Sequence, residues 1–143
     1  MRVKKVWRYC CDFCKKTSLS KGAMNKHEKH CTMNPDRKCR MCAYMEGYSA
    51  PLPELIAMLP EPSELLYEIE CGYQATGEGK MPAFWEAFEK MRDAAEQCPA
   101  CILAALRQRG IPAWVWEEKY DYAKECKSLW DEVNAENMER YNY

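Results

Sequence analysis

A cysteine-rich, basic stretch between residues 11 and 42 leaves this 143-residue chain few ways to fold. Cys11 and Cys14 form a C-x2-C pair, His27 follows after twelve residues, and Cys31 follows after three more. A short C-x2-C turn directs two sulfurs at one point, and a His with a second donor four residues later lies on one helix face. Thiolate and imidazole groups at this spacing are typical of a tetrahedral zinc site. The pattern therefore predicts zinc bound by these four side chains.

Two neighbouring side chains leave the choice of ligands open. Cys10 precedes Cys11, and His30 precedes Cys31. We favour Cys11 and Cys31 because they give the x2, x12 and x3 spacings together. Cysteines buried as small apolar residues are the alternative interpretation of the same pattern.

This run resembles the two-Cys two-His zinc-finger family, in its variant with Cys as the last ligand. The resemblance implies a small ββα-type finger, which we place at residues 1–34. The family's pattern also asks for three apolar positions around the metal. Tyr9 and Met24 match two of them, and the third falls on Ser18 with Leu19 beside it. We therefore expect a finger core that is weak or shifted by one residue.

A second pair of motifs predicts a second metal site. The first knuckle is Cys39-x2-Cys42 and the second knuckle is Cys98-x2-Cys101. A four-Cys structural zinc site needs two such knuckles, and no other C-x-x-C pair remains. If they pair, a second zinc ion staples the basic N-terminal part to the acidic remainder.

Rival interpretations of the remaining cysteines stay open. Cys31 or Cys71 could complete a site with the first knuckle instead. The second knuckle could be a redox pair with a helix behind it, although no strand is visible before it. Cys126 lies on an apolar helical stripe and is expected to be a core thiol, while the role of Cys71 is undecided.

Length and composition bound the class of protein. A chain of this size fits one domain, or a finger with one small domain, and can bury a core. The sequence shows no signal peptide with an apolar central region and no apolar run of the roughly 18 residues that a membrane span needs. Zinc-type spacing in a chain with ten cysteines is better explained by a reducing cytosol than by disulfides. We expect a cytoplasmic protein without a membrane partner.

Charge is distributed very unevenly along the chain. Residues 1–42 hold 12 Lys and Arg against 3 Asp and Glu, a net charge of +9, while residues 43–143 hold 9 against 19, a net charge of −10. Such asymmetry suggests either an arm that binds a polyanion or two parts that shield each other. We divide the chain into a basic zinc finger at residues 1–34 and an acidic, mainly helical domain at residues 35–143.

Local signals place the helices. Ser20 is expected to cap a finger helix over residues 21–30. In the C-terminal domain we expect helices over residues 51–59, 64–70, 82–97, 102–109 and 113–139, with residues 72–81 as a flexible loop. Two of these helices carry clear apolar stripes, made of Phe84, Phe88, Met91 and Ala95 and of Trp116, Tyr120, Ala123, Cys126, Trp130 and Val133. The predicted fold class is therefore mainly α, with a small zinc finger and a helical body stapled by a four-Cys site.

Viewed whole, the chain resembles a group of small, largely uncharacterised zinc-finger proteins of bacteriophages and bacteria. The segments that carry the resemblance are SKGAMNKHEKHC, NPDRKCRMC, CPACILAALRQ and YAKECKSLWDEVN. It implies a phage or bacterial setting, with the bacterial cytoplasm as location, and two metal sites. It implies no established activity.

The finger helix is a poor reader of base sequence. Base contacts in such helices come from positions −1, 3 and 6, which are Ser20, Ala23 and Lys26 here, and only Lys26 could make the usual contact to guanine. Basic side chains could still hold phosphates. Trp7, Tyr9 and Phe13 could stack on unpaired bases. The candidate nucleic-acid-binding residues are Lys15, Lys16, Lys21, Lys26, Lys29, Arg37, Lys38 and Arg40.

An enzyme is not expected. The chain has two histidines, and four protein ligands at each zinc leave no open catalytic position. The preferred hypothesis is a non-catalytic protein with two zinc ions that binds DNA or RNA with low specificity and has no small-molecule substrate. The alternative is a phage-encoded interaction module that binds or inhibits a host enzyme or defence complex, for which its acidic helical face could serve.

Overall fold

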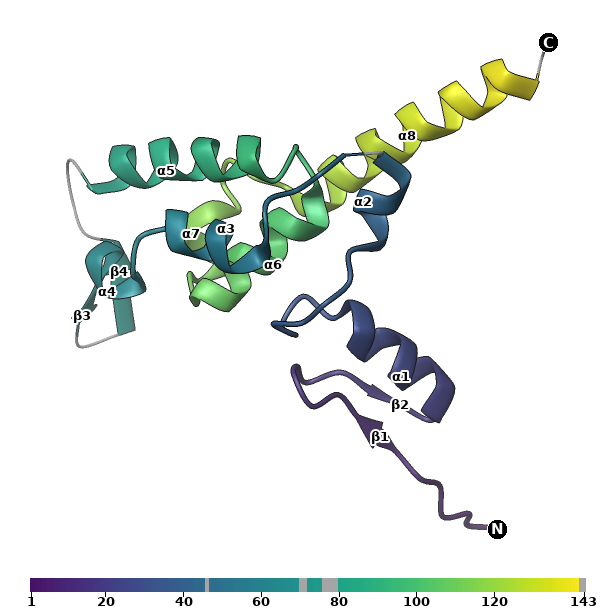
Figure 1. Cartoon of the computed structure of the whole chain (residues 1–143). Helices are drawn as coiled ribbons and strands as arrows, with labels where there is room; N and C mark the ends of the chain where they lie inside the picture. The colour runs from purple at the N-terminus through teal and green to yellow at the C-terminus, as the bar shows by residue number, and fades with distance from the viewer. Residues whose placement is uncertain (46, 70–71, 76–79, 142–143) are drawn as a thin grey trace.

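The N-terminal part of the protein is a small unit of two strands and one helix. A computed structural model describes residues 1–45, 47–69, 72–75 and 80–141. Strands β1 (Tyr9–Cys10) and β2 (Thr17–Ser18) pair antiparallel, with Tyr9 opposite Ser18, and α1 (Lys21–His30) follows. We call residues 9–33, which contain β1, β2 and α1, the N-terminal unit (Figure 1). The predicted helix cap is confirmed, because the Ser20 hydroxyl accepts a hydrogen bond from the Ala23 backbone N–H at 3.2 Å.

The core of this unit is very small. Its buried side chains are Cys11, Met24 and Cys31, and Tyr9 and Met33 pack against them. Of the two expected outcomes, the weak core is found and the shift to Leu19 is not, because the Leu19 side chain is 64% exposed. Met33, from the segment after α1, supplies the missing apolar contact instead. With so little apolar burial, the unit depends on its donor cluster for stability.

The segment that follows α1 is an ordered connection. Asn34 is buried, its amide nitrogen donates to the Glu28 carbonyl at 2.8 Å, and its side-chain oxygen accepts from the Asp36 N–H. The Lys38 N–H also returns to the Lys29 carbonyl at 2.9 Å. These bonds satisfy carbonyl groups at the end of α1 and fix the direction of the chain towards the rest of the protein.

The remainder of the chain, here called the helical body, is mainly α-helical and includes one small hairpin. In Figure 1 its last helix extends away from the other helices. In chain order its elements are α2 (Arg40–Met45), α3 (Leu52–Met58), α4 (Pro62–Leu65), β3 (Leu66–Ile69), β4 (Gly72–Ala75), α5 (Lys80–Ala94), α6 (Pro99–Arg109), α7 (Ala113–Trp116) and α8 (Tyr122–Tyr141).

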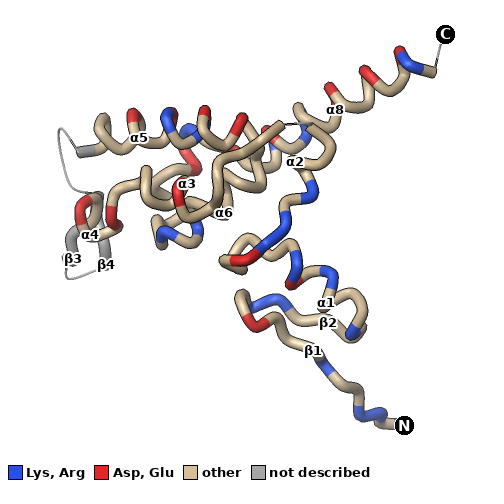
Figure 2. The backbone as a smooth tube through the Cα atoms, viewed as in Figure 1, with Lys and Arg blue, Asp and Glu red and all other residues tan. Residues whose placement is uncertain are grey.

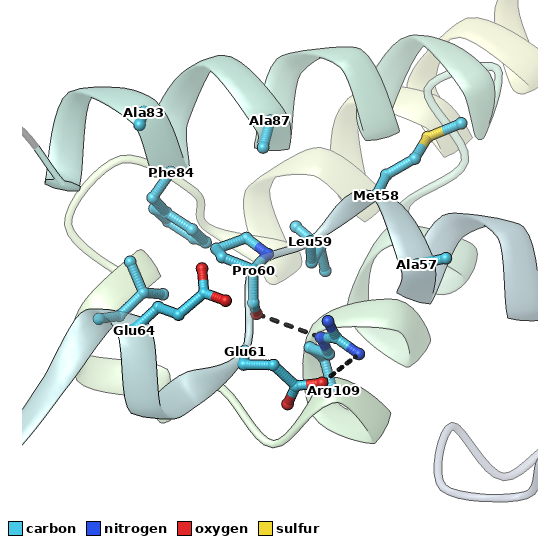
Figure 3. Close-up of a pocket in the computed structure, with 11 residues that line it drawn as sticks. Ala57, Met58, Leu59, Pro60, Glu61, Glu64, Ala83, Phe84, Ala87 and Arg109 are labelled. Atoms are coloured by element: carbon cyan, nitrogen blue, oxygen red, sulfur yellow. Dashed lines mark hydrogen bonds and ion pairs between the residues drawn. The ribbon is translucent and has the colours of Figure 1, made fainter.

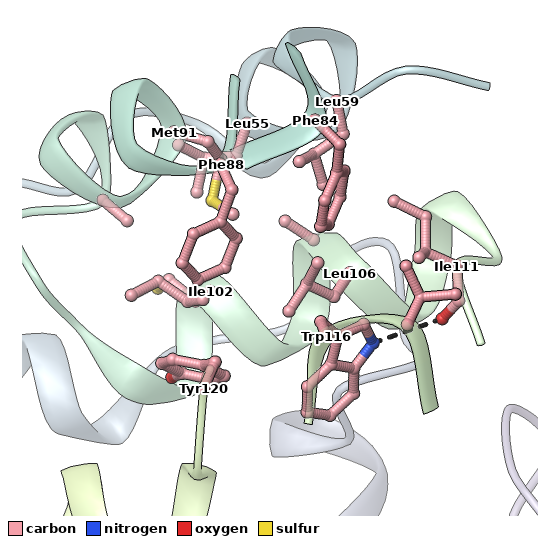
Figure 4. Close-up of a cluster of buried hydrophobic side chains, with 14 of the residues drawn as sticks. Leu55, Leu59, Phe84, Phe88, Met91, Ile102, Leu106, Ile111, Trp116 and Tyr120 are labelled. Carbon is pink, nitrogen blue, oxygen red and sulfur yellow. Dashed lines mark hydrogen bonds between the residues drawn. The ribbon is translucent and has the colours of Figure 1, made fainter. Parts of the chain in front are cut away.

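Helix α6 lies at the centre of the body. It packs against α3 and α8, and its apolar residues are buried around most of its circumference. The predicted stripe on α5 is confirmed, since Phe84, Phe88, Met91 and Ala95 are each at most 1% exposed. Figure 4 shows this cluster, in which the Phe88 ring meets the Tyr120 ring edge-on at 5.5 Å. The body therefore has an apolar core of its own.

The helix predicted over residues 64–70 is wrong. Only one turn, α4, forms, and Leu66 is already extended, with φ −124° and ψ 143°. An antiparallel hairpin follows, in which Ile69 pairs with Gly72, so this glycine begins a strand instead of stopping a helix. The LYEI segment is rich in residues that favour strands, and the pairing overrides the weak helical pattern. The predicted loop over residues 72–81 is thus partly β4, and residues 76–79 lie outside the described residues.

The single helix predicted over residues 113–139 is also wrong. Helix α7 ends at Trp116, and α8 begins at Tyr122, where the Asp121 carboxylate accepts from the Lys124 N–H at 3.1 Å. Trp116 and Tyr120 are buried, but α8 contains no buried residue. Cys126 is half-buried, so the expectation of a core thiol is wrong as well. Because the helix is interrupted between Trp116 and Tyr122, the predicted stripe does not continue as a buried face of α8.

Two further features complete the fold. A surface pocket of about 530 Å³ lies between α3, α4 and α5 (Figure 3), where Arg109 donates to the Pro60 carbonyl and forms an ion pair with Glu61 at 3.2 Å. Within the described ranges, no helix is long and apolar enough to cross a membrane.

Candidate metal centres

The first donor cluster lies inside the N-terminal unit. The ligand atoms of Cys11, Cys14, His27 and Cys31 all lie within 4.8 Å of one another. Cys11 follows β1, Cys14 lies in the turn to β2, His27 projects from α1, and Cys31 caps that helix. The Cys14 sulfur and His27 Nε2 are 3.2 Å apart. These are the four side chains that the x2, x12 and x3 spacings select.

The two competing donors lie outside this cluster. Cys10 is exposed on β1. His30 Nδ1 lies 2.7 Å from the Lys38 carbonyl oxygen, so the His30 imidazole contacts the connection after α1 and not the cluster. The structure therefore decides the open choice in favour of Cys11 and Cys31.

In the first cluster the pKa values of Cys14 and His27 are lowered, whereas burial raises the pKa of Cys31. Burial opposes ionisation of Cys14, but the Lys16 N–H and the thiols of Cys11 and Cys31 outweigh it and hold the Cys14 pKa below its ordinary value. Burial and the nearby Lys16 charge lower the pKa of His27, which keeps its imidazole neutral. A neutral imidazole and a thiolate are the forms in which these side chains bind metal, and the lowered pKa of Cys14 favours the thiolate.

The second donor cluster joins α2 to α6. The sulfurs of Cys39, Cys42, Cys98 and Cys101 lie within 4.8 Å of one another, with Cys39 3.5 Å from Cys98 and Cys42 3.5 Å from Cys101. Cys42 lies in the first turn of α2 and Cys101 in the first turn of α6. The two knuckles therefore meet across 59 residues of sequence, as predicted.

A turn before α6 sets the position of the second knuckle. Glu96 and Gln97 adopt positive φ values of 52° and 61°, which end α5 and bring Cys98 to the start of α6. The Gln97 amide nitrogen donates to the Asp93 carboxylate, and the Gln97 side-chain oxygen accepts from Arg92 Nε. Two side chains from the last turn of α5 therefore hold Gln97 in place. Helix α5, and not a strand, leads into the second knuckle.

The alternative interpretations of these cysteines can now be compared with the structure. Both thiols of the second knuckle, Cys98 and Cys101, contact thiols of the first knuckle. Cys31 does not complete the second site, because it belongs to the first cluster. Cys71 lies outside the described residues.

The sulfurs of the second cluster share protons. Thiol donors from Cys101 and Cys98 hold the Cys39 pKa far below its ordinary value. Burial and the charge of Cys101 raise the pKa of Cys42 to about 12, and hydrogen bonding to Cys101 and Cys39 raises that of Cys98. One thiolate thus forms easily, and further ionisation is resisted by burial and like charge. A bound dication removes that resistance.

Both donor sets fit zinc. Four soft or borderline donors converging on one point favour Zn²⁺ over Mg²⁺ or Ca²⁺, which prefer oxygen. Two distinct clusters are consistent with two zinc ions. When bound, each ion would supply a structural cross-link with four protein ligands.

Arg37 faces the second cluster. Its Nη1 lies 3.8 Å from the Cys101 sulfur, and its Nε is buried without a hydrogen-bond partner in the described part of the chain. Four thiolates with a bound zinc ion would carry a net charge of −2, which this guanidinium would partly offset. Of the predicted phosphate-binding residues, Arg37 therefore lies beside the second cluster and not on the exposed basic surface.

Helix α6 also holds the N-terminal unit directly. Arg107 Nη1 donates to the Thr32 hydroxyl at 2.6 Å, and Gln108 donates to the carbonyls of Thr32 and Asn34 at 2.8 and 3.0 Å. Thr32 follows the ligand Cys31. Sequence reasoning missed these contacts because they join residues at least 74 positions apart, and nothing in the local pattern signals them.

The other predicted phosphate-binding side chains lie along the N-terminal unit and the connection to α2. Figure 2 shows these basic residues on that part of the chain. Within the described ranges, the ion pairs to carboxylates all lie in the helical body. The exposed residues of the predicted set are Lys15, Lys16, Lys21, Lys26, Lys29, Lys38 and Arg40.

Comparison with known proteins gives no relative. No family model, curated protein or solved structure matches the chain.

Zinc binding is expected to release protons and to weaken as the pH falls. The raised pKa values of Cys42 and Cys98 keep both thiols protonated at pH 7 in the metal-free protein. Both must ionise to bind, so zinc affinity at the second site should fall about 100-fold per pH unit. Calorimetry in buffers of different ionisation enthalpy measures the protons released. Release of fewer than two protons per ion at this site would contradict the assignment.

Proposed function

We propose that this is a non-catalytic zinc protein whose N-terminal unit holds the phosphate backbone of nucleic acid without strong sequence specificity. The observation that carries the proposal is the set of exposed lysines on this unit, together with Lys38 and Arg40 after it, which have no carboxylate partner in the described structure. Cations of this kind release counterions from a polyanion on binding. The alternative of basic residues docked on acidic helices finds no support in these contacts.

The way the unit meets the helical body supports the same proposal. The contacts use Thr32, Asn34 and Arg37 on one side and α6 on the other. The outer surface of α1 and the turn between β1 and β2 are not covered by the body (Figure 1). A long polyanion can therefore approach the lysines without displacing the helical body.

Low sequence specificity follows from the start of α1. The Ser20 hydroxyl is engaged with the Ala23 N–H, and Ala23 offers only a methyl group. Lys26 remains as a single base-contacting candidate, and one contact gives little discrimination. The order β1, β2, α1 with a final Cys ligand supports membership of the finger type described above, and the resemblance to phage and bacterial proteins supports a bacterial cytoplasm as its setting.

The proposed function includes no catalysis, because four protein ligands would fill the tetrahedral shell of each zinc ion. Both clusters then serve as cross-links, with no open position for water or substrate. The pocket beside Arg109 lies in another part of the body, and we assign no reaction to it.

A second candidate function is a protein-interaction module. It is favoured by α8, whose exposed Trp130, Met138 and Tyr141 lie on a helix that leaves the body (Figure 1). Trp130 meets the exposed Tyr44 of α2 edge-on at 5.3 Å. Exposed aromatic residues suit a protein interface. Absence of nucleic-acid binding by the zinc-loaded protein at low salt would favour this function over the first.

Charge removal from the N-terminal unit tests the proposal. Replacing four of its lysines with glutamine should weaken nucleic-acid binding about tenfold or more at low salt. The slope of log affinity against log salt should fall by about 0.7 to 0.9 for each phosphate that the variant no longer neutralises. Fluorescence anisotropy over a salt series measures both. The variant combines Lys15→Gln, Lys16→Gln, Lys26→Gln and Lys29→Gln.

A matched control removes the same charge from the helical body. If binding follows net charge alone, both quadruple variants will lose the same affinity, and the proposed site is wrong. If the N-terminal unit is the site, the control keeps the affinity of the unaltered protein. The control combines Lys90→Gln, Lys119→Gln, Lys124→Gln and Lys127→Gln.

A further inference from the structure

The chain before β1 is an exposed basic arm, residues 1–8. It has no helix or strand, and every side chain in it is exposed. It carries four basic residues and no acidic one, a net charge of +4 from side chains. Such a segment attracts a polyanion, but charge alone does not distinguish a duplex from a single strand.

Trp7 is the unusual residue of this arm. Its side chain is 86% exposed, and in the described part of the protein no aromatic ring or cation stacks on it. Tryptophan is highly buried on average in folded proteins, so this indole contributes nothing to the fold that would explain it. Both faces of the ring are available to a ligand.

The structure separates the three aromatic residues of this region. Tyr9 packs against the small core of the N-terminal unit, so it is not a stacking residue. Phe13 is 39% exposed in the turn between β1 and β2, beside Lys15 and Lys16. That turn is held by the cluster, since the Phe13 N–H donates to the Cys11 sulfur at 3.4 Å. Trp7 lies between Lys5 and Arg8, and Phe13 lies just before Lys15 and Lys16. The two rings are separated by at most about 20 Å of chain.

We infer that this arm and turn bind single-stranded nucleic acid, with Trp7 as the main base-stacking residue. Aromatic rings between cations are the arrangement that binds unpaired bases, because each base has an exposed face for stacking and each phosphate a positive partner. In a duplex those faces are covered by neighbouring bases, and only the phosphates can be held. The inference rests on the proposed function and adds the class of nucleic acid to it.

The test measures how the zinc-loaded full chain and its Trp7 variants bind single-stranded and double-stranded nucleic acid. The probes are labelled oligothymidine, oligouridine and a duplex, each of about 15 nucleotides or base pairs, at about 50 mM salt. We expect the single strands to bind more tightly than the duplex. Trp7→Ala should weaken single-strand binding about 5- to 100-fold and leave duplex binding unchanged, while Trp7→Phe should retain most of the affinity. The two single strands show whether DNA or RNA is preferred, and binding of either supports the inference.

Trp114→Ala is the matched control. Trp114 is also exposed, at 51%, but lies on α7 of the helical body, so this variant should bind like the unaltered protein. Equal binding of duplex and single strand, or equal losses on both with Trp7→Ala, overturns the stacking role and leaves the proposed function standing. Absence of binding to all three probes overturns the proposed function itself. Zinc content of each variant shows that the N-terminal unit remains folded.

Discussion

Replacing Cys14 with serine is expected to unfold the N-terminal unit while the helical body stays folded. The unit buries only three side chains, and two of them, Cys11 and Cys31, are donors to the same cluster. Structural zinc contributes about 10 to 16 kcal/mol of apparent binding free energy in isolated finger peptides at pH 7, far more than this core can supply. The variant should bind one zinc ion, and amide signals from β1, β2 and α1 should lose their dispersion in NMR spectra.

The chain offers close controls for this experiment. Cys10→Ser and His30→Gln alter the donors next to Cys11 and Cys31 but lie outside the cluster. Both variants should keep two zinc ions and the dispersed spectrum. If Cys10→Ser loses an ion and Cys11→Ser keeps it, the ligand assignment is wrong.

Replacing Cys98 with serine is expected to remove the second ion and detach α2 from α6. Cys98 is 1% exposed and 3.5 Å from Cys39, so the loss of its thiolate leaves a closed site with three donors. We expect the free energy of unfolding to fall by about 4 kcal/mol or more, at the upper end of single-residue effects. The core that includes Cys98 also buries many side chains that are not donors, Phe88 and Ile102 among them, so the body should remain folded. Elemental analysis and chemical denaturation measure the two effects.

Cys126→Ser controls for the loss of a thiol from the body. Cys126 is half-buried on α8 and belongs to neither cluster. This variant should retain two zinc ions and stay within about 1 kcal/mol of the unaltered protein. Loss of zinc from it, with both ions retained in Cys98→Ser, would refute the second site.

Local chemistry explains which parts of the fold could be predicted. The first donor set follows from a turn and one helix, whose geometry is fixed over at most about 20 residues. Ser20 caps α1 because a hydroxyl before an amphipathic segment satisfies a free backbone N–H. The stripe on α5 is long and regular, so its burial could be predicted from its period.

Short or competing signals explain the errors. The predicted helix over residues 64–70 spans only two turns, and pairing between β3 and β4 outweighs so weak a preference. The long last helix was predicted from apolar spacing, but Asp121 caps a new helix after the buried Tyr120. One local hydrogen bond there changes which residues of the following segment face the core.

Residue types and their spacing along the chain were sufficient to propose the eight donors and to show the opposite charges of the two parts, because both depend on covalent order alone. Tertiary structure was needed to pair the knuckles, to turn Arg37 towards the Cys101 sulfur, and to hold Thr32 against Arg107 and Gln108. These contacts join residues 59 to 76 positions apart, and their geometry is set by the packing of α6 within the core, which no local pattern encodes.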